Sequence, residues 1–138
     1  MTDGPVLLVE DEAVLREALA DALRRHGVET VESGTAEDAA DKLAGGLRPK
    51  LVFLDLNLPG RSGWDLLRTV LAPAIGRPPV VLLTAQTVDP ARMRQYAVDG
   101  YLPKPFALTT FLATARRFLE AGPGQAEARQ SPGASRTR

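Results

Sequence analysis

Four stretches of this 138-residue sequence place chemically useful side chains directly after runs of apolar residues. They are Glu10-Asp11-Glu12 after Val6–Val9, Asp55 after Leu51–Leu54, Thr84 after Val80–Leu83, and Lys104 shortly after Tyr101-Leu102. Carboxylates that pack together repel one another and lose hydration, and a cation can neutralise that cost. Carboxylates, carbonyls and water are the ligands of Mg²⁺. If these acids meet in space, the sequence predicts a Mg²⁺ site.

The same stretches contain the residue types that phosphoryl transfer needs. Asp55 offers a carboxylate nucleophile, Thr84 a hydroxyl donor and Lys104 an ammonium group. Three residues of these stretches also have an ordinary structural explanation: Glu12 as a helix cap, Thr84 as packing at a strand end, and Lys104 before proline as a solvated charge. Asp55 does not fit the capping explanation, because Leu56–Pro59 does not begin a helix. The combination, in this order, predicts a phosphoryl-transfer site.

Strands and helices must alternate along the chain to position these residues. The four apolar runs predict strands, and Val28–Ser33 predicts another. Apolar spacings of three and four, with cap signals, predict the helices. The first helix carries Leu15, Leu19, Ala22 and Leu23 and ends at a Gly27 cap. The second runs from Thr35 to Gly45-Gly46, the third over Trp64–Leu71, and the fourth over about 90–97 after Asp89. The last carries apolar residues from Leu108 to Leu119 and ends at Gly122.

This alternation of five strands with five helices predicts right-handed crossovers and a doubly wound parallel α/β sheet. Both faces of such a sheet are covered, which agrees with strands that read as unbroken apolar runs. Sites in these sheets lie beyond the carboxyl ends of the strands. The chemically useful residues listed above therefore belong to one edge of the sheet.

The composition predicts one folded domain over residues 1–122. Apolar residues make up 44% and charged residues 25%, and seventeen basic residues balance seventeen acidic ones, which gives no attraction to nucleic acid or an anionic membrane. No apolar run approaches the roughly 20 residues of a membrane span, cysteine is absent, and no secretory leader is recognisable. We expect a cytoplasmic protein. Residues 123–138 lack a large apolar side chain and are expected to form a disordered tail.

Four motifs together resemble the receiver domain of two-component response regulators. They are Leu7-Leu8-Val9-Glu10-Asp11-Glu12, Asp55-Leu56-Asn57-Leu58-Pro59-Gly60 with Gly63, Leu83-Thr84-Ala85, and Tyr101-Leu102-Pro103-Lys104-Pro105-Phe106. Their order and spacing, within about residues 5–121, make the resemblance specific. It implies a flavodoxin-like, CheY-like fold with strand order 2-1-3-4-5, and it identifies residues 1–122 as the receiver domain.

By this resemblance, Asp55 is the phosphoacceptor of a histidine-to-aspartate phosphorelay. The carboxylates of Glu10, Asp11 and Asp55, with the backbone carbonyl of Asn57, would bind Mg²⁺. The donor would be a sensor histidine kinase or a phosphotransfer protein, and an unidentified protein would be the downstream target. A receiver catalyses only its own phosphorylation and dephosphorylation, and we expect a monomer or weak dimer that does not itself bind nucleic acid or membrane.

The resemblance also implies a switch. Thr84 and Lys104 would contact the phosphoryl group, and Tyr101 would be the switch aromatic. Their movement would change the surface of the fourth helix, fifth strand and fifth helix. The peptide bond before Pro105 is expected to be cis. Two departures, Gly100 and the pair Thr110 and Thr114, stand where the winged-helix transcription-factor branch has charged or amide residues, so the charged dimer face of that branch is not expected.

Other functions fit the residues less well. A haloacid dehalogenase-type hydrolase needs a second aspartate where this chain has Asn57. A flavodoxin-type nucleotide site needs a phosphate-binding loop where the chain has Glu10-Asp11-Glu12, which repels phosphate. His26, in the last turn of a predicted helix, is assigned no function. The remaining alternative is a degenerate receiver that acts only as a protein-interaction module.

Overall fold

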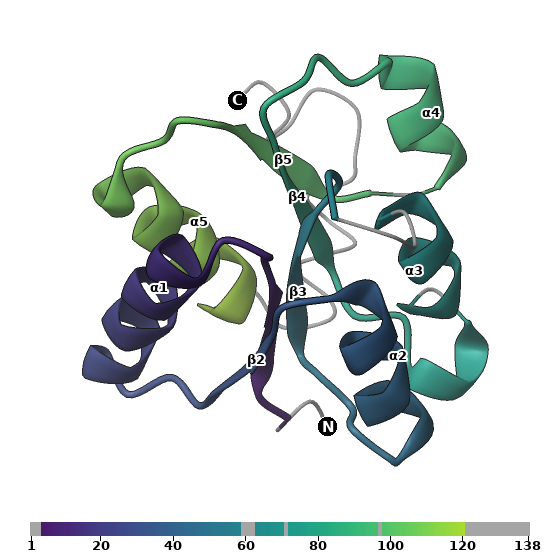
Figure 1. Ribbon diagram of the computed structural model, residues 1–138, viewed down its shortest axis with the longest axis horizontal. Helices are drawn as coiled ribbons and strands as arrows, with labels where there is room; N and C mark the ends of the chain where they lie inside the picture. Colours follow the sequence, from purple (N-terminus) through teal and green to yellow (C-terminus); the bar gives the residue numbers. More distant parts are fainter. Residues whose placement is uncertain (1–3, 59–62, 71, 97, 121–138) are drawn as a thin grey trace.

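The computed structural model describes residues 4–58, 63–70, 72–96 and 98–120, and these form one parallel sheet between two helical layers (Figure 1). The strands are β1 (Val6–Val9), β2 (Thr30–Ser33), β3 (Leu51–Asp55), β4 (Val80–Thr84) and β5 (Gly100–Pro103). Their order is β2-β1-β3-β4-β5, and every neighbouring pair is parallel. The doubly wound sheet and its expected strand order are confirmed.

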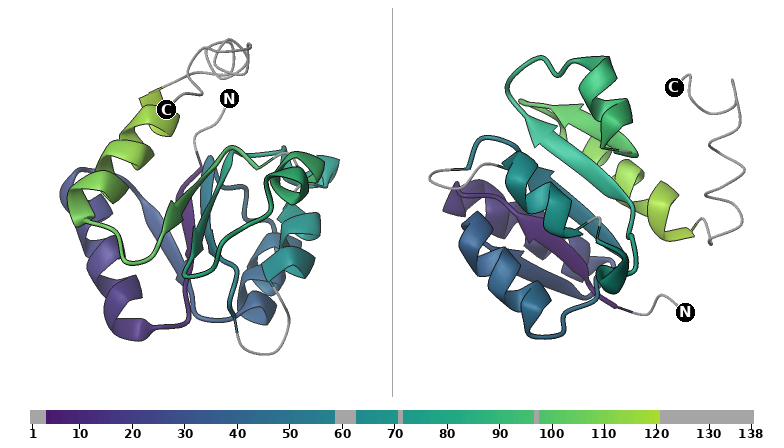
Figure 2. Two further views of the ribbon diagram at one scale, coloured as in Figure 1. Left: turned by 90° about the horizontal axis from the view of Figure 1, so that it is seen from above. Right: turned by 90° about the vertical axis from the view of Figure 1, so that its right-hand side faces the viewer.

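The helices are placed on the two faces of the sheet as a doubly wound fold requires. They are α1 (Ala13–Arg25), α2 (Ala36–Ala44), α3 (Gly63–Val70), α4 (Pro90–Gln95) and α5 (Leu108–Glu120), with a short 3₁₀ helix at Pro73–Ile75. The views agree that α1 and α5 lie on one face and α2, α3 and α4 on the other (Figures 1 and 2). None of the helices within the described ranges is long and apolar enough to cross a membrane.

Each face of the sheet has its own apolar core, because side chains alternate along a strand. Leu8 and Phe53 pack toward α1 and α5, where the ring of Phe53 lies 4.5 Å from that of Phe111. Leu7 and Leu54 pack toward α2 and α3. All four strand residues are fully buried. Strands buried on both faces have no polar alternation, and this is why they read as continuous apolar runs.

The helix ends confirm most cap predictions. Thr35 Oγ1 accepts a hydrogen bond from the Asp38 backbone N–H at 3.0 Å, and Asp89 Oδ1 accepts one from Ala91 N–H at 2.9 Å. Gly27 has the left-handed φ of +78° that a helix end favours. The predicted start of the second strand at Val28 is wrong, because its N–H bonds back to the carbonyl of Leu23 at the end of α1.

The fourth helix is short and contacts Trp64 of α3. None of its residues is buried, and it ends at Gln95, before the predicted 97. The half-buried Trp64 of α3 lies 5.0 Å from the ring of Tyr96, and the guanidinium of Arg92 lies 4.2 Å above the Trp64 ring. The predicted helix ends at Leu71 and Gly122 and the predicted tail over 123–138 lie outside the described residues.

Candidate functional site

An acidic cluster forms where β1 and β3 end side by side. The register pairs Val9 with Leu54, so Glu10 and Asp55 leave adjacent strands at the same level. Carboxylate oxygens of Glu10, Asp11 and Asp55 all lie within 4.8 Å of one another. Glu10 and Asp55 are buried and Asp11 is exposed. The sequence prediction that these three acids meet is confirmed, and the cluster can bind a metal ion.

Lys104 reaches this cluster from beyond β5, two strands away. Its Nζ lies 2.8 Å from Glu10 Oε1 and 3.3 Å from Asp55 Oδ2. Its backbone N–H donates to the carbonyl of Thr84 at 2.7 Å, which ties it to the end of β4. The bond between Lys104 and Pro105 is cis, as expected. The lysine that precedes proline therefore pairs with two carboxylates of the acidic cluster and is not a solvated loop charge.

The electrostatics of the cluster favour an additional cation. Burial, with the nearby charge of Asp55, raises the pKa of Glu10 from 4.5 to about 7, although Lys104 opposes the rise. Burial tends to lower the pKa of Lys104, but its pairing with Glu10 and Asp55 outweighs this and raises the pKa.

Glu10 Oε1 also has an unmet bonding capacity. It is close enough to Lys104 for an ion pair, yet it is buried without an aligned hydrogen bond. Hard carboxylate oxygens with unmet bonding capacity suit Mg²⁺. The residues present therefore fit the ion that the sequence predicts.

The backbone around Asp55 is tightly packed. Asp55 Oδ1 accepts a hydrogen bond from the Asn57 N–H at 2.9 Å, which brings Asn57 to the cluster through its backbone. A Cβ at Gly63 would lie 2.8 Å from the Asp55 carbonyl oxygen and 2.8 Å from Leu56 Cα. Glycine is needed here because α3 begins against the backbone that carries Asp55.

The two predicted switch residues lie on the next two strands of the sheet, Thr84 at the end of β4 and Tyr101 on β5. Thr84 is fully buried, and its Oγ1 accepts from the Gln86 N–H at 2.9 Å and donates to the Gln86 carbonyl at 3.2 Å. Tyr101, paired in register with Leu82 of the neighbouring strand, is 45% exposed. In this structure the Thr84 hydroxyl bonds to the backbone of Gln86, and Tyr101 is partly exposed to solvent.

Sequence reasoning missed one residue at this edge. The Arg16 guanidinium donates to the carbonyl oxygen of Glu10 at 3.0 Å. Its signal was its place on α1, where Arg16 shares a face with buried Leu19, Ala20 and Leu23 at spacings of three, four and seven. A cation at the head of an apolar stripe indicates a specific partner.

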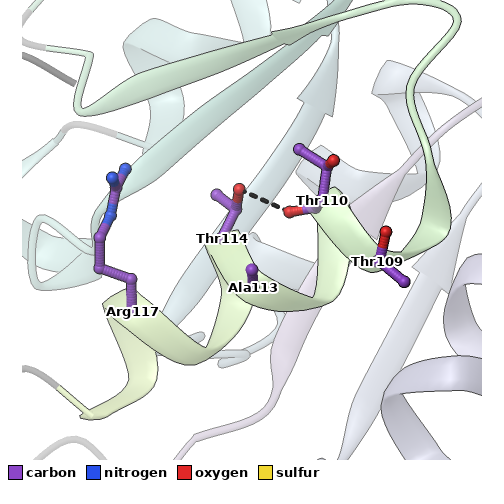
Figure 3. A pocket seen from close by; sticks show the side chains of 5 residues that line it. All are labelled: Thr109, Thr110, Ala113, Thr114 and Arg117. Carbon is purple, nitrogen blue, oxygen red and sulfur yellow. Dashed lines mark hydrogen bonds between the residues drawn. The ribbon is translucent and has the colours of Figure 1, made fainter.

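A shallow hollow of about 410 Å³ lies along α5 (Figure 3). It is lined by Thr109, Thr110, Ala113, Thr114 and Arg117. The Thr114 hydroxyl donates to the carbonyl of Thr110, one turn earlier, at 2.8 Å. None of the acidic-cluster residues lines this hollow. The two threonines that depart from the winged-helix branch thus give this part of α5 two hydroxyl-bearing side chains beside the charged Arg117.

Comparison with known proteins agrees with this geometry. The family model described as "Response regulator receiver domain" matches residues 6–116. The DNA-binding response regulator MtrA of Mycolicibacterium paratuberculosis is 38% identical over 116 residues, which cover 83% of this chain and 50% of MtrA. The phosphate regulon transcriptional regulatory protein PhoB of Pseudomonas aeruginosa is 32% identical over 132 residues, covering 93% of this chain and 57% of PhoB. The chain thus spans about half the length of these relatives.

Solved structures give the same result. The chemotaxis response regulator CheY4 of Vibrio cholerae superposes with a TM-score of 0.75 at 26% identity, covering 85% of this chain and 99% of CheY4. The response regulator protein TrrA of Thermotoga maritima, solved in complex with Mg(2+)-BeF, has a TM-score of 0.71 at 27% identity, covering 86% of this chain and 99% of TrrA.

Proposed function

Because this chain belongs to the response regulator receiver family of two-component signalling, we propose that it accepts a phosphoryl group on Asp55. A receiver implies a histidine kinase as partner, so the proposed donor is the phosphohistidine of a sensor kinase or of a phosphotransfer protein. The family does not consist of enzymes that convert metabolites. The proposed role is accordingly a signalling switch that catalyses only its own phosphorylation and dephosphorylation.

The observation that carries this proposal is the meeting of a buried aspartate, two further carboxylates and a lysine at one sheet edge. Asp55 is 1% exposed, lies in the acidic cluster, and has Lys104 Nζ 3.3 Å from Oδ2. A structural ion pair would need one carboxylate for one ammonium group, whereas here Lys104 pairs with two carboxylates and a third, that of Asp11, lies in the same cluster. The excess negative charge is explained if the site also takes a divalent ion.

The proposed Mg²⁺ ligands are the carboxylates of Glu10, Asp11 and Asp55 with the backbone carbonyl of Asn57. When bound, the ion would neutralise negative charge on the carboxylates and on the transferring phosphoryl group. The complex of TrrA with Mg(2+)-BeF supports this assignment, since beryllofluoride imitates a phosphoryl group. The three carboxylates offer oxygens within 4.8 Å of one another, a spacing at which one ion could contact all three.

The chemistry proposed for the chain's own residues follows from their positions. A carboxylate oxygen of Asp55 attacks phosphorus, a bond forms between them, and the bond from phosphorus to the donor nitrogen breaks. The histidine ring leaves with its electron pair. The ammonium of Lys104, already beside Asp55 Oδ2, pairs with a phosphoryl oxygen and stabilises its charge.

The proposed switch starts from the hydroxyl of Thr84. It now bonds to the backbone of Gln86, and a phosphoryl oxygen on Asp55 would offer a stronger, charge-assisted acceptor. We expect Thr84 to turn toward the phosphoryl group and the exposed Tyr101 to move inward. This changes the surface formed by α4, β5 and α5, which would contact the downstream protein (Figure 1).

Phosphorylation can be tested by incubating the chain with acetyl phosphate and Mg²⁺. Intact-protein mass spectrometry should detect an added mass of about 80 Da, one phosphoryl group. Asp55→Asn should remain unlabelled, while Asp41→Asn, which alters an exposed aspartate on α2, should be labelled like wild type. Labelling that persists in Asp55→Asn would exclude this acceptor. A wild-type chain that is never labelled would favour the alternative, a receiver that acts only as an interaction module.

A further inference from the structure

Arg16 connects the edge strand β2 to the loop that carries the acidic cluster. Its Nη1 donates to the carbonyl oxygen of Glu10 at 3.0 Å, and its Nε donates to Glu32 Oε1 on β2 at 3.3 Å. The N–H of Glu10 donates to the carbonyl of Ser33 at 3.0 Å. The backbone of Glu10 is therefore bound on one side by β2 and on the other by Arg16, whose side chain is only 19% exposed.

A second arginine, Arg24, shares the carboxylate that pairs with Arg16. Glu32 accepts from Arg24 Nη1 through its other oxygen, at 3.0 Å, so both of its oxygens are paired with α1. Arg24 also donates to the carbonyl of Thr30 at 2.8 Å. The two arginines thus share one carboxylate but differ in their other contact. Arg16 bonds to the loop of the acidic cluster, and Arg24 bonds to β2.

Gly34 leaves the space that this arginine occupies. A Cβ there would lie 2.9 Å from Arg16 Nη1, and no other atom beyond the Arg16 guanidinium comes within 4 Å of it. The φ angle of Gly34 is outside the left-handed region, so its backbone conformation does not require glycine. The absent side chain is better explained by the guanidinium that passes beside it.

We propose that Arg16 is a positioning residue for the Mg²⁺ site. Binding the Glu10 carbonyl sets the orientation of the Glu10-Asp11 peptide, and with it the direction in which both carboxylates face Asp55. Residues that hold metal ligands in position commonly contribute about tenfold or more to metal affinity. This inference rests on the proposed function, because it concerns the affinity for Mg²⁺.

The sign of the effect separates positioning from simple electrostatics. A guanidinium close to a cation site repels the cation, so its removal by charge alone would tighten Mg²⁺ binding. If Arg16 acts by positioning, its removal weakens binding instead. Arg24 provides the matched control, since Arg24→Met removes one arginine from the same carboxylate and leaves the Glu10 carbonyl bonded.

Calorimetric titration of the full chain with Mg²⁺ tests the proposal. We expect Arg16→Met to weaken Mg²⁺ binding by about tenfold or more, and Arg24→Met to change it by less than about twofold. Arg16→Lys, which retains the charge and a donor, should recover part of the affinity. Unchanged or tighter binding in Arg16→Met would overturn the proposal, as would equal losses in the two methionine variants.

A variant that leaves Arg16 in place tests the same proposal if Arg16→Met does not fold. Gly34→Ala should displace the guanidinium and weaken Mg²⁺ binding, whereas Gly45→Ala, where the added Cβ comes no closer than 3.4 Å to other atoms, should not. Equal Mg²⁺ affinities in these two variants would also overturn the proposal. A wild-type chain that binds no Mg²⁺ would overturn the proposed function itself, and this inference with it.

Discussion

Replacing Glu10 by glutamine should stabilise the Mg²⁺-free protein while it impairs the site. Glu10 is fully buried, and its pKa is raised from 4.5 to about 7, mainly by burial. As the pH rises, the unfolded state loses this proton first, so the folded state binds more protons between these two values. Stability therefore falls as pH increases across this window, and the full cost is present above about pH 7.

The size of the effect follows from the same shift. Each unit of pKa corresponds to about 1.4 kcal/mol, so a rise from 4.5 to about 7 costs the folded state about 3 kcal/mol once Glu10 is charged. Glutamine keeps the shape and cannot ionise. At about pH 8 without Mg²⁺, Glu10→Gln should raise the free energy of unfolding by about 3 kcal/mol, and at about pH 5 by less than about 1 kcal/mol.

Urea unfolding of both proteins in EDTA, at about pH 5 and about pH 8, measures this difference. Glu12→Gln is the control, because Glu12 is exposed and its side chain makes no capping hydrogen bond, so its effect should stay within about 0.5 kcal/mol. Adding Mg²⁺ at about 100 times its dissociation constant should stabilise wild type by about 2.7 kcal/mol. The difference in unfolding free energy between Glu10→Gln and wild type should then become smaller. Equal stabilities at about pH 8, or a difference that does not change with pH, would refute the reasoning.

Two further predictions concern the switch and α4. Thr84→Ala should still be phosphorylated in the presence of Mg²⁺, but should lose most of the NMR shift changes around Tyr101, because the hydroxyl that would move is gone; equal shift changes in mutant and wild type would contradict this coupling. Trp64→Ala should accelerate amide exchange in α4 by about tenfold, since the ring pair and the Arg92 contact together contribute roughly 1–2 kcal/mol; unchanged exchange in α4 would show that other contacts attach it.

The chain's local patterns were enough to place the candidate site residues at one edge of the sheet. Leu51–Leu54 reads as a strand buried on both faces, and such strands run parallel with their carboxyl ends at one edge. Glu10 and Asp55 follow two of these strands, so their place at the same edge was predictable from the sequence, and the pairing of β1 with β3 brings them together. The helix start at Thr35 was predictable for a similar reason, because a cap depends on residues only three positions apart.

The strand order, the Asn57 carbonyl as a metal ligand and Tyr101 as the switch aromatic came from resemblance to a family and not from these patterns. Apolar runs show that a strand is buried but not which strand lies beside it. The order β2-β1-β3-β4-β5 agrees with the resemblance, whereas the ligand role of the Asn57 carbonyl stays a prediction.

Only the tertiary structure decided which side chains bind across the crossovers. Arg16 and Glu32 are sixteen residues apart, and Trp64 lies on α3 whereas Tyr96 directly follows α4. Their contacts therefore depend on how α1 and α4 pack in the fold. The direction of the Thr84 hydroxyl likewise depends on the path of the chain at Gln86. Periodicity determines the face on which a side chain lies. The atom it meets there is determined by the packing of elements whose separation in sequence leaves no local signal.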